Sequence, residues 1–175
     1  MHNKRYTNIV ASALREYFET GSTKATEELY GHDDKLRKAC FVTLKKANGQ
    51  LRGCIGSIKA RYKNLTTEII KNAVAAAMHD PRFAPVKPKE LKNLKISVEV
   101  LDKPEEISPD ALPDPQEYGL IIEEAGTNKR GVLLPGIEGI DSPEQQVQII
   151  RRKAGIQQSG FDDLKLFKFK TEKYE

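Results

Sequence analysis

Apolar residues recur at helical spacing in three stretches of the chain, which are residues 4–20, 65–79 and 143–155. Gly21 follows the first stretch as a stop signal, and Asn64 precedes the second as a predicted N-cap. Pro143 opens the third, and Gly155 ends it. The pattern predicts three amphipathic helices.

The polar segment from residue 21 to 37 lacks such a stripe. It is predicted to be a loop with one helical turn around residues 27–30, and its His32 is predicted to be a solvated loop residue.

Residues 38–57 change to a pattern rich in β-formers, interrupted by Asn48-Gly49. Asn-Gly between apolar runs predicts a β-hairpin with a two-residue type I′ turn. The predicted pairs are Ala47–Gln50, Lys45–Arg52, Thr43–Cys54 and Phe41–Gly56. The core face then receives the apolar residues Val42, Leu44, Leu51 and Ile55, while Arg52 and Cys54 share the opposite face. A bulge at Gly53 or Gly56 would reverse the faces beyond it.

Further strands are predicted in the second half of the chain, at residues 94–102, 119–125, 131–135 and 164–174. In the last of these the apolar phase changes between Leu166 and Phe167, which predicts either a bulge or burial on both faces. The proline-rich segment 104–117 is predicted to be a boundary between two lobes or the wall of a cleft.

Composition narrows the class of protein. The 175 residues are 38% apolar and 31% charged, which fits one globular domain. Two cysteines without a CxxC motif and three scattered histidines give no metal-ligand constellation. The net charge of +4 is spread without a basic run, and neither a membrane span nor a signal peptide is recognisable. A cytoplasmic location is therefore expected, and the sequence points to no particular cofactor.

The stretch LRGCIG, residues 51–56, stands out because Gly53 and Gly56 weaken a predicted strand. Glycine inside a strand usually marks a bulge, or the close approach of another backbone or a ligand. The stretch also holds Arg52 and Cys54, which packing alone does not explain.

Three blocks of the sequence resemble the AMMECR domain family: LRGCIG at residues 51–56, DPRF at 80–83 and LLP at 133–135. The resemblance spans nearly the whole chain and implies a single α+β domain over residues 1–175. In that family a larger and a smaller lobe, built of mainly antiparallel sheets with flanking helices, enclose a cleft lined by LRGCIG. It also implies a place in the AmmeMemoRadiSam system, beside a Memo-like and a radical-SAM protein. This chain departs from the family pattern at Gly136, where glutamine is common, and in having no tryptophan.

Two hypotheses from different classes follow. The first, which ranks higher, is an accessory module that binds a small anionic ligand or an extended partner segment. Its predicted contacts are Arg52, Gly53, Cys54, Gly56, Asp80 and Arg82, because bare backbone admits another chain and arginines bind anions.

The second hypothesis is a cysteine-dependent enzyme. Here Cys54 is the nucleophile, Arg52 favours its thiolate, and His79 is the candidate base. Nucleic-acid binding is a third alternative, supported only by the mild positive charge. The sequence does not decide whether the protein is an enzyme.

Overall fold

The computed structural model describes residues 4–31, 34–157 and 160–175. The chain divides into two compact units, the first made of residues 1–100 with 172–175 and the second of residues 101–171. Each carries one four-stranded sheet with antiparallel pairing, so the predicted α+β class is confirmed. Within the described ranges, no helix is long and apolar enough to cross a membrane. His32 lies outside the described residues.

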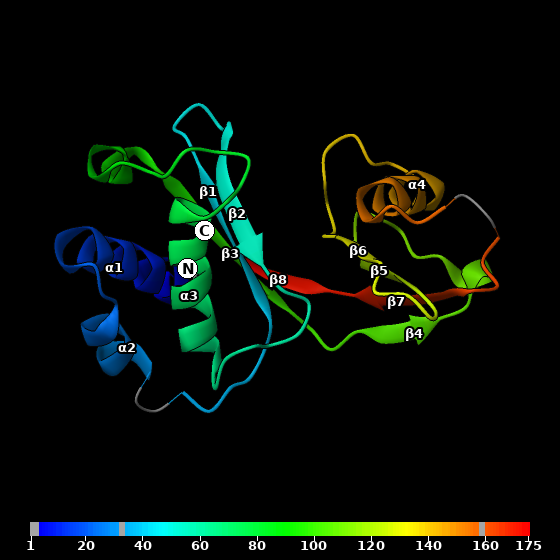
Figure 1. The fold of residues 1–175 in the computed structure, drawn as a ribbon, viewed down its shortest axis with the longest axis horizontal. Coiled ribbons are helices and arrows are strands. Elements are labelled where there is room, and N and C mark those ends of the chain that lie inside the picture. Colours follow the sequence, from blue (N-terminus) through cyan, green and yellow to red (C-terminus); the bar gives the residue numbers. More distant parts are fainter. Residues whose placement is uncertain (1–3, 32–33, 158–159) are drawn as a thin grey trace. The chain divides into compact units, whose positions relative to one another are not determined.

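The first unit contains three α-helices, α1 (Arg5–Thr20), α2 (Lys24–Gly31) and α3 (Leu65–Met78), and a 3-10 helix at Pro88–Asn93. The predicted ends of α1 and α3 are confirmed. Gly21 adopts the left-handed conformation (φ 73°) that ends α1, and the Asn64 side chain accepts a hydrogen bond from the Thr67 amide at 2.9 Å. Helix α3 packs on α1, α2, β1 and β2 (Figure 1).

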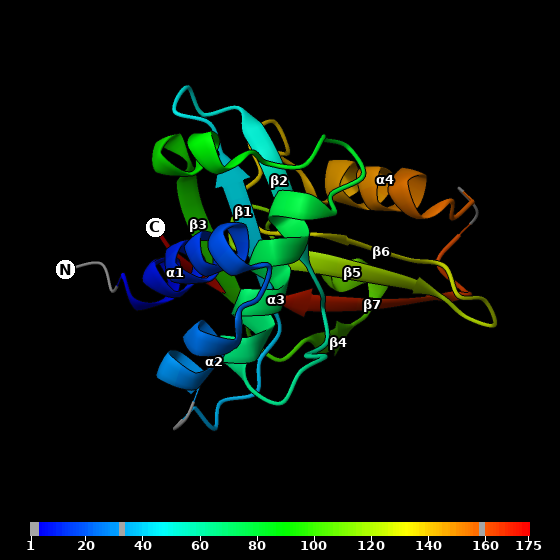
Figure 2. The same ribbon diagram turned by 60° about the vertical axis from the view of Figure 1, so that its left-hand side comes forward.

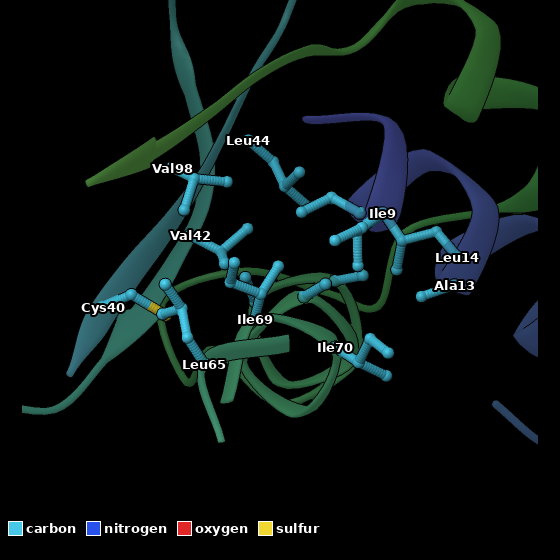
Figure 3. Packing of buried hydrophobic residues seen from close by; sticks show 14 of the residues in the cluster. Ile9, Ala13, Leu14, Cys40, Val42, Leu44, Leu65, Ile69, Ile70 and Val98 are labelled. Carbon is cyan, nitrogen blue, oxygen red and sulfur yellow. The ribbon is translucent and has the colours of Figure 1, made fainter. Parts of the chain in front are cut away.

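The sheet of the first unit has the strand order β2-β1-β3-β8. Its strands are β1 (Cys40–Lys45), β2 (Leu51–Gly56), β3 (Lys95–Leu101) and β8 (Thr171–Tyr174). Val42, Leu44 and Val98 pack against Ile9 and Ile69 in the core of this unit (Figure 3). The LRGCIG segment therefore forms an edge strand of this sheet.

The hairpin turn differs from the prediction. The Lys46 amide bonds to the Gln50 carbonyl and the Gly49 amide to the Lys46 carbonyl, so three residues form the loop. Gly49 has φ +87°, and no non-glycine residue in the described ranges has positive φ, so Asn48 does not adopt a type I′ turn. Instead the Asn48 side chain accepts a hydrogen bond from the Gln50 amide at 3.1 Å.

A bulge at Arg52 compensates for the longer turn. Lys45 pairs with Leu51, whereas Leu44 pairs with Gly53, so Arg52 is the extra residue. The predicted pair of Lys45 with Arg52 is therefore wrong. Beyond the bulge, Thr43 pairs with Cys54 as predicted, because the turn and the bulge each shift the register by one residue in opposite senses. Ile55 packs on the core as predicted, while Leu51 is only half-buried.

Helix α2 is longer than the single turn predicted for residues 27–30. The Glu16 carboxylate of α1 accepts hydrogen bonds from the amides of Ala25 and Thr26 at 3.0 and 2.8 Å, and from the Thr26 hydroxyl at 2.7 Å. These are amides that a helix N-terminus leaves without partners. The cap comes from another helix, which local sequence patterns do not reveal.

The second unit has the strand order β4-β7-β5-β6, with helix α4 (Pro143–Ala154) contacting β5 and β6. The strands are β4 (Glu105–Ile107), β5 (Gly119–Glu124), β6 (Arg130–Leu133) and β7 (Leu164–Phe169), with a short 3-10 helix at Pro109–Ala111. Ser142 and Gln145 form a capping box at the start of α4, and Gly155 ends it with φ 65°. Figure 2 shows α4 beside the strands of this sheet. Val147 and Ile150 of α4 are buried in one cluster with Leu120 and Ile122 of β5.

In this region the structure corrects the predicted lobe boundary and decides between the two alternatives predicted for the last strand. The units divide between Val100 and Leu101, ahead of the proline-rich segment 104–117, which contains β4 instead of a boundary. Pairing of β7 with β5 runs without a bulge at Leu166 and Phe167, so the second alternative holds. Their partners Ile122 and Ile121 on β5 are both buried, which places apolar residues on both faces.

Candidate functional site

The LRGCIG and DPRF blocks contact each other. Helix α3 ends at Met78, and Pro81 prevents its continuation, so the chain turns sharply at Asp80. The Asp80 side chain accepts a hydrogen bond from the Cys54 amide at 2.9 Å, and the Arg82 guanidinium donates to the Cys54 carbonyl at 3.3 Å. Of the residues predicted for the site, the structure brings Cys54, Asp80 and Arg82 together.

Asp80 and Arg82 form a two-point ion pair. Arg82 Nε lies 3.0 Å from Asp80 Oδ1 and Nη2 lies 2.7 Å from Oδ2, while the Asp80 Oδ1 also accepts from the Arg82 amide. The Arg82 hydrogen bond lowers the pKa of Asp80 to about 2. The Asp80 side chain is 2% exposed and that of Arg82 is 55% exposed. A buried carboxylate thus fixes an accessible guanidinium, which also lies 5.5 Å from the centre of the Phe83 ring.

This ion pair also covers the outer edge of the sheet at Cys54. Because β2 is an edge strand, backbone groups that point away from β1 have no neighbouring strand. At Cys54 both the amide and the carbonyl bond to side chains of the Asp80–Arg82 pair instead. The edge is therefore capped at the centre of the motif.

The Cys54 thiol is half-buried and accepts a hydrogen bond from the Thr43 hydroxyl at 3.2 Å. Burial raises the pKa of this thiol, and the Thr43 hydrogen bond and the Arg82 charge lower it only in part. The raised pKa keeps Cys54 in its protonated form at neutral pH, which is the opposite of an activated nucleophile.

Arg52 has a different role from the one predicted. It is 8% exposed, and its guanidinium bonds to the Glu90 carboxylate through Nε at 2.9 Å and Nη2 at 3.1 Å. It also donates to the carbonyls of Ala84 and Pro85 at 2.9 and 3.2 Å. Arg52 therefore ties β2 to the segment after α3, and the arginine whose charge acts on the Cys54 thiol is Arg82.

The two glycines of the motif are explained by contacts within the first unit. A Cβ atom on Gly53 would lie 2.1 Å from the Ala76 carbonyl oxygen of α3. A Cβ atom on Gly56 would lie 2.4 Å from both the Cys40 carbonyl oxygen and the Phe41 ring. The close approach predicted from the sequence is thus made by the chain's own backbone and an aromatic ring.

His79 directly precedes Asp80 in the chain, but the interactions that act on the Cys54 thiol do not include it. It is exposed at the end of α3, where its amide bonds to the Ala75 carbonyl at 2.8 Å. Its side chain lines a hollow together with Tyr17 of α1 and Lys71 of α3. The groups that shift the pKa of the Cys54 thiol, besides burial, are Thr43, Arg82, Glu99 and Asp80.

Glu68 and Asn72, two buried polar residues of α3, have structural roles that the sequence did not predict. Glu68 is 0% exposed and accepts hydrogen bonds from the Ser57 hydroxyl and the Arg61 and Tyr62 amides at 2.8–3.0 Å. Asn72 accepts from Arg61 Nη2 and donates to the Cys40 carbonyl. These bonds hold the connection that leaves LRGCIG. The sequence feature that could have indicated these roles is the presence of two polar residues, four positions apart, on a helix face that is otherwise apolar.

Within the described ranges, no group of three or more histidine, cysteine, aspartate or glutamate residues could hold a metal ion. The chemistry that the site offers is instead one fixed guanidinium beside a protonated thiol and an aromatic ring.

Comparison with solved structures identifies a similar fold. The crystal structure of the uncharacterized protein PH0010 from Pyrococcus horikoshii matches with a TM-score of 0.80 and 30% sequence identity, covering 96% of this chain and 88% of that one.

Sequence comparison gives similar relatives and a family. A Thermotoga maritima protein is 44% identical over 149 residues, which are 85% of this chain and 82% of that protein. A Clostridium acetobutylicum protein is 37% identical over 174 residues, and the match spans 97% of this chain but 36% of that protein. The AMMECR1 family matches residues 7–174. The chain therefore belongs to the AMMECR1 family.

Proposed function

We propose that this protein is an accessory component that binds its partners, a Memo-like and a radical-SAM protein, through the surface around LRGCIG. The contact is an anionic group, on a partner or a small ligand, received by Arg82 beside Cys54. The observation that carries the proposal is that a buried carboxylate holds Arg82 in place while more than half of its side chain is exposed.

Arg82 is suited to this role because its geometry is set before the ligand arrives. A guanidinium has five N–H donors. Nε and Nη2 are engaged by Asp80 and the Cys54 carbonyl, and across the residues that the structure describes Nη1 makes no hydrogen bond to protein. A carboxylate or phosphate bound there forms charge-assisted hydrogen bonds without first ordering the side chain.

The Cys54 thiol supports binding over catalysis. Burial raises its pKa, Thr43 donates a hydrogen bond to it, and Arg52, predicted to favour the thiolate, is committed to Glu90. His79, predicted as the base, lines a separate hollow. A neutral thiol next to Arg82 serves as a small apolar contact surface.

The test replaces Arg82 with glutamine and measures binding to the Memo-like and radical-SAM proteins of the same genome by calorimetry. Loss of a charge-assisted hydrogen bond reduces the binding free energy by about 1.5–3 kcal/mol, so we expect the affinity to fall by roughly tenfold or more. Arg130→Gln is the matched control, because Arg130 is 41% exposed and ion-paired with Glu123 at 2.7 Å. Equal affinity of R82Q and R130Q would overturn the proposal.

Alkylation of the native protein separates this proposal from the cysteine-dependent enzyme. The pH dependence of the rate at which iodoacetamide alkylates Cys54 is expected to give a thiol pKa above the ordinary value of about 8.5. Burial raises the pKa of Cys40 to about 12, so Cys54→Ser should remove nearly all reaction in native protein. A Cys54 pKa well below 8.5 would favour the cysteine-dependent enzyme. Binding of the protein to double-stranded DNA at low salt would favour the nucleic-acid alternative.

A further inference from the structure

The helices of the first unit line a hollow, open to solvent, that the LRGCIG site does not use. It has a volume of about 540 Å³ and is lined among others by Tyr17, Lys24, Tyr62, Lys71, Val74 and His79. Pockets for small molecules usually measure about 300–1,000 Å³. The hollow is therefore large enough for a small organic ligand.

The lining combines apolar surface with an excess of positive charge. Tyr17, Tyr62 and Val74 are half-buried and offer ring faces and aliphatic surface. Two lysines and one glutamate, Glu27, supply the formal charges, and His79 adds an imidazole. Such a lining complements a ring that carries an anionic group.

Side-chain bonds hold the walls of this hollow in place. Lys71 of α3 pairs with Glu27 of α2 at 2.6 Å, and the buried Thr23 hydroxyl donates to the same carboxylate oxygen at 2.8 Å. On the other side, Glu16 of α1 binds the first amides of α2. Figure 2 shows α1, α2 and α3 of the first unit as neighbours. The space exists without rearrangement of the helices, which reduces the entropy lost on binding.

We infer that this hollow is a second binding site, for a small organic anion with an aromatic ring. The anionic group lies near Lys24, since Lys71 is already paired with Glu27, and the ring lies against the tyrosines. The site is independent of the proposed partner surface, since none of its lining residues belongs to LRGCIG or DPRF.

The probe for the test is 1-anilinonaphthalene-8-sulfonate, which joins fused aromatic rings to a sulfonate. We expect saturable one-to-one binding to the native full chain, measured by fluorescence, with amide shift changes in nuclear magnetic resonance confined to residues 17–27, 62 and 71–79. Lys24→Glu should weaken binding at least fivefold, because it reverses a lining charge on an exposed side chain.

Lys129→Glu provides the control, since it makes the same change in net charge in the second unit, where Lys129 pairs with Glu124. Ala75→Phe fills the hollow from α3 and should abolish binding while circular dichroism stays native. The inference is overturned if native protein shows no saturable binding, if both lysine variants weaken it equally, or if folded A75F still binds. None of these outcomes bears on the Arg82 experiment.

Discussion

At the scale of single residues, the motif LRGCIG separates into two kinds of position. Gly53, Gly56 and Arg52 serve the architecture of the first unit, the glycines by admitting α3 and Phe41 and the arginine by binding Glu90. Cys54 presents its thiol and anchors the Asp80–Arg82 pair. Most of the motif is therefore explained by folding, and the functional question narrows to Cys54 and its two charged neighbours.

Gly53→Ala is expected to destabilise the first unit strongly. The added Cβ would lie 2.1 Å from a backbone oxygen of α3, so either β2 or the helix must move. Overpacking of this kind costs about 1–3 kcal/mol, and more where backbone blocks relaxation. Urea denaturation measures the change in the free energy of unfolding.

Gly31→Ala is the control for that experiment. A Cβ on Gly31 meets only the Thr66 methyl at 3.8 Å, an ordinary contact, and Gly31 is the last residue of α2. Alanine favours a helix interior over glycine by about 1 kcal/mol, and less at a helix end, so this variant should be close to neutral. If both variants lost the same stability, the close approach of α3 would not explain Gly53.

At the scale of elements, the unpaired side of strand β2 is the sensitive feature. Edge strands with open amides and carbonyls pair with other chains unless charges or loops cover them. Here one ion pair, Asp80 with Arg82, covers both backbone groups of Cys54. The same pair is the proposed partner contact, so binding and protection of the edge depend on the same side chains.

Asp80→Ala is expected to increase self-association. The variant removes the acceptor of the Cys54 amide and releases Arg82, so β2 offers an open edge. Sedimentation velocity at increasing concentration should show larger species for this variant than for the native chain. Glu123→Ala removes an ion pair from β5, an interior strand, and should sediment like the native protein. Identical profiles for both variants would refute the protective role.

The helices show which structural features local sequence patterns can predict. Helices α1, α3 and α4 were predictable because their apolar spacing and their caps, Gly21, Asn64 and Gly155, are contiguous in sequence. Helix α2 was not, because the carboxylate that caps it belongs to Glu16 of another helix. Patterns along the chain predict what neighbouring residues decide, and they miss what a distant side chain completes.

The same limit applies to the candidate site. Cys54, Asp80 and Arg82 were predicted because two unusual blocks contained them, and the structure brings these three together. The bonding partners of the Arg52 side chain were not predictable, since they depend on a bulge and on Glu90, which lies 38 residues further along the chain. The hollow that the His79 side chain lines likewise depends on the packing of three helices, which the sequence does not reveal.

At the scale of the whole molecule, the two compact units each have their own core. The two ion-paired carboxylates whose pKa is lowered to about 2 both belong to the first unit. Arg52 lowers the pKa of Glu90 to about 2, and Arg82 does the same for Asp80. Both ion pairs tie β2 to the segment that follows α3. Acid is therefore expected to weaken the first unit through these two carboxylates.

The free energy of unfolding should fall between about pH 4.5 and pH 2. Both pKa values are lower in the folded state than the ordinary 4.5 of Glu90 and 3.8 of Asp80, so their stabilisation is complete above those values and disappears as pH approaches 2. At about 1.4 kcal/mol per pKa unit, Asp80 contributes roughly 2 kcal/mol and Glu90 roughly 3 kcal/mol. Urea titrations at pH 6, 4 and 3 measure this loss.

The double variant Arg52→Met with Glu90→Gln tests the assignment. It removes the Glu90 contribution, so its stability should depend less on pH over the same range than that of the native chain. An unchanged pH dependence would assign acid sensitivity to other groups.

The hairpin that carries LRGCIG has a consequence for comparing chain lengths among relatives. Shortening the turn by one residue leaves the Lys46–Gln50 bond and the bulge as they are, so Thr43 stays opposite Cys54. Removing the extra residue of the bulge also keeps that pair, but it takes away Arg52, the arginine that binds Glu90. A one-residue gap at the turn should therefore be tolerated more readily among relatives than a gap at the bulge.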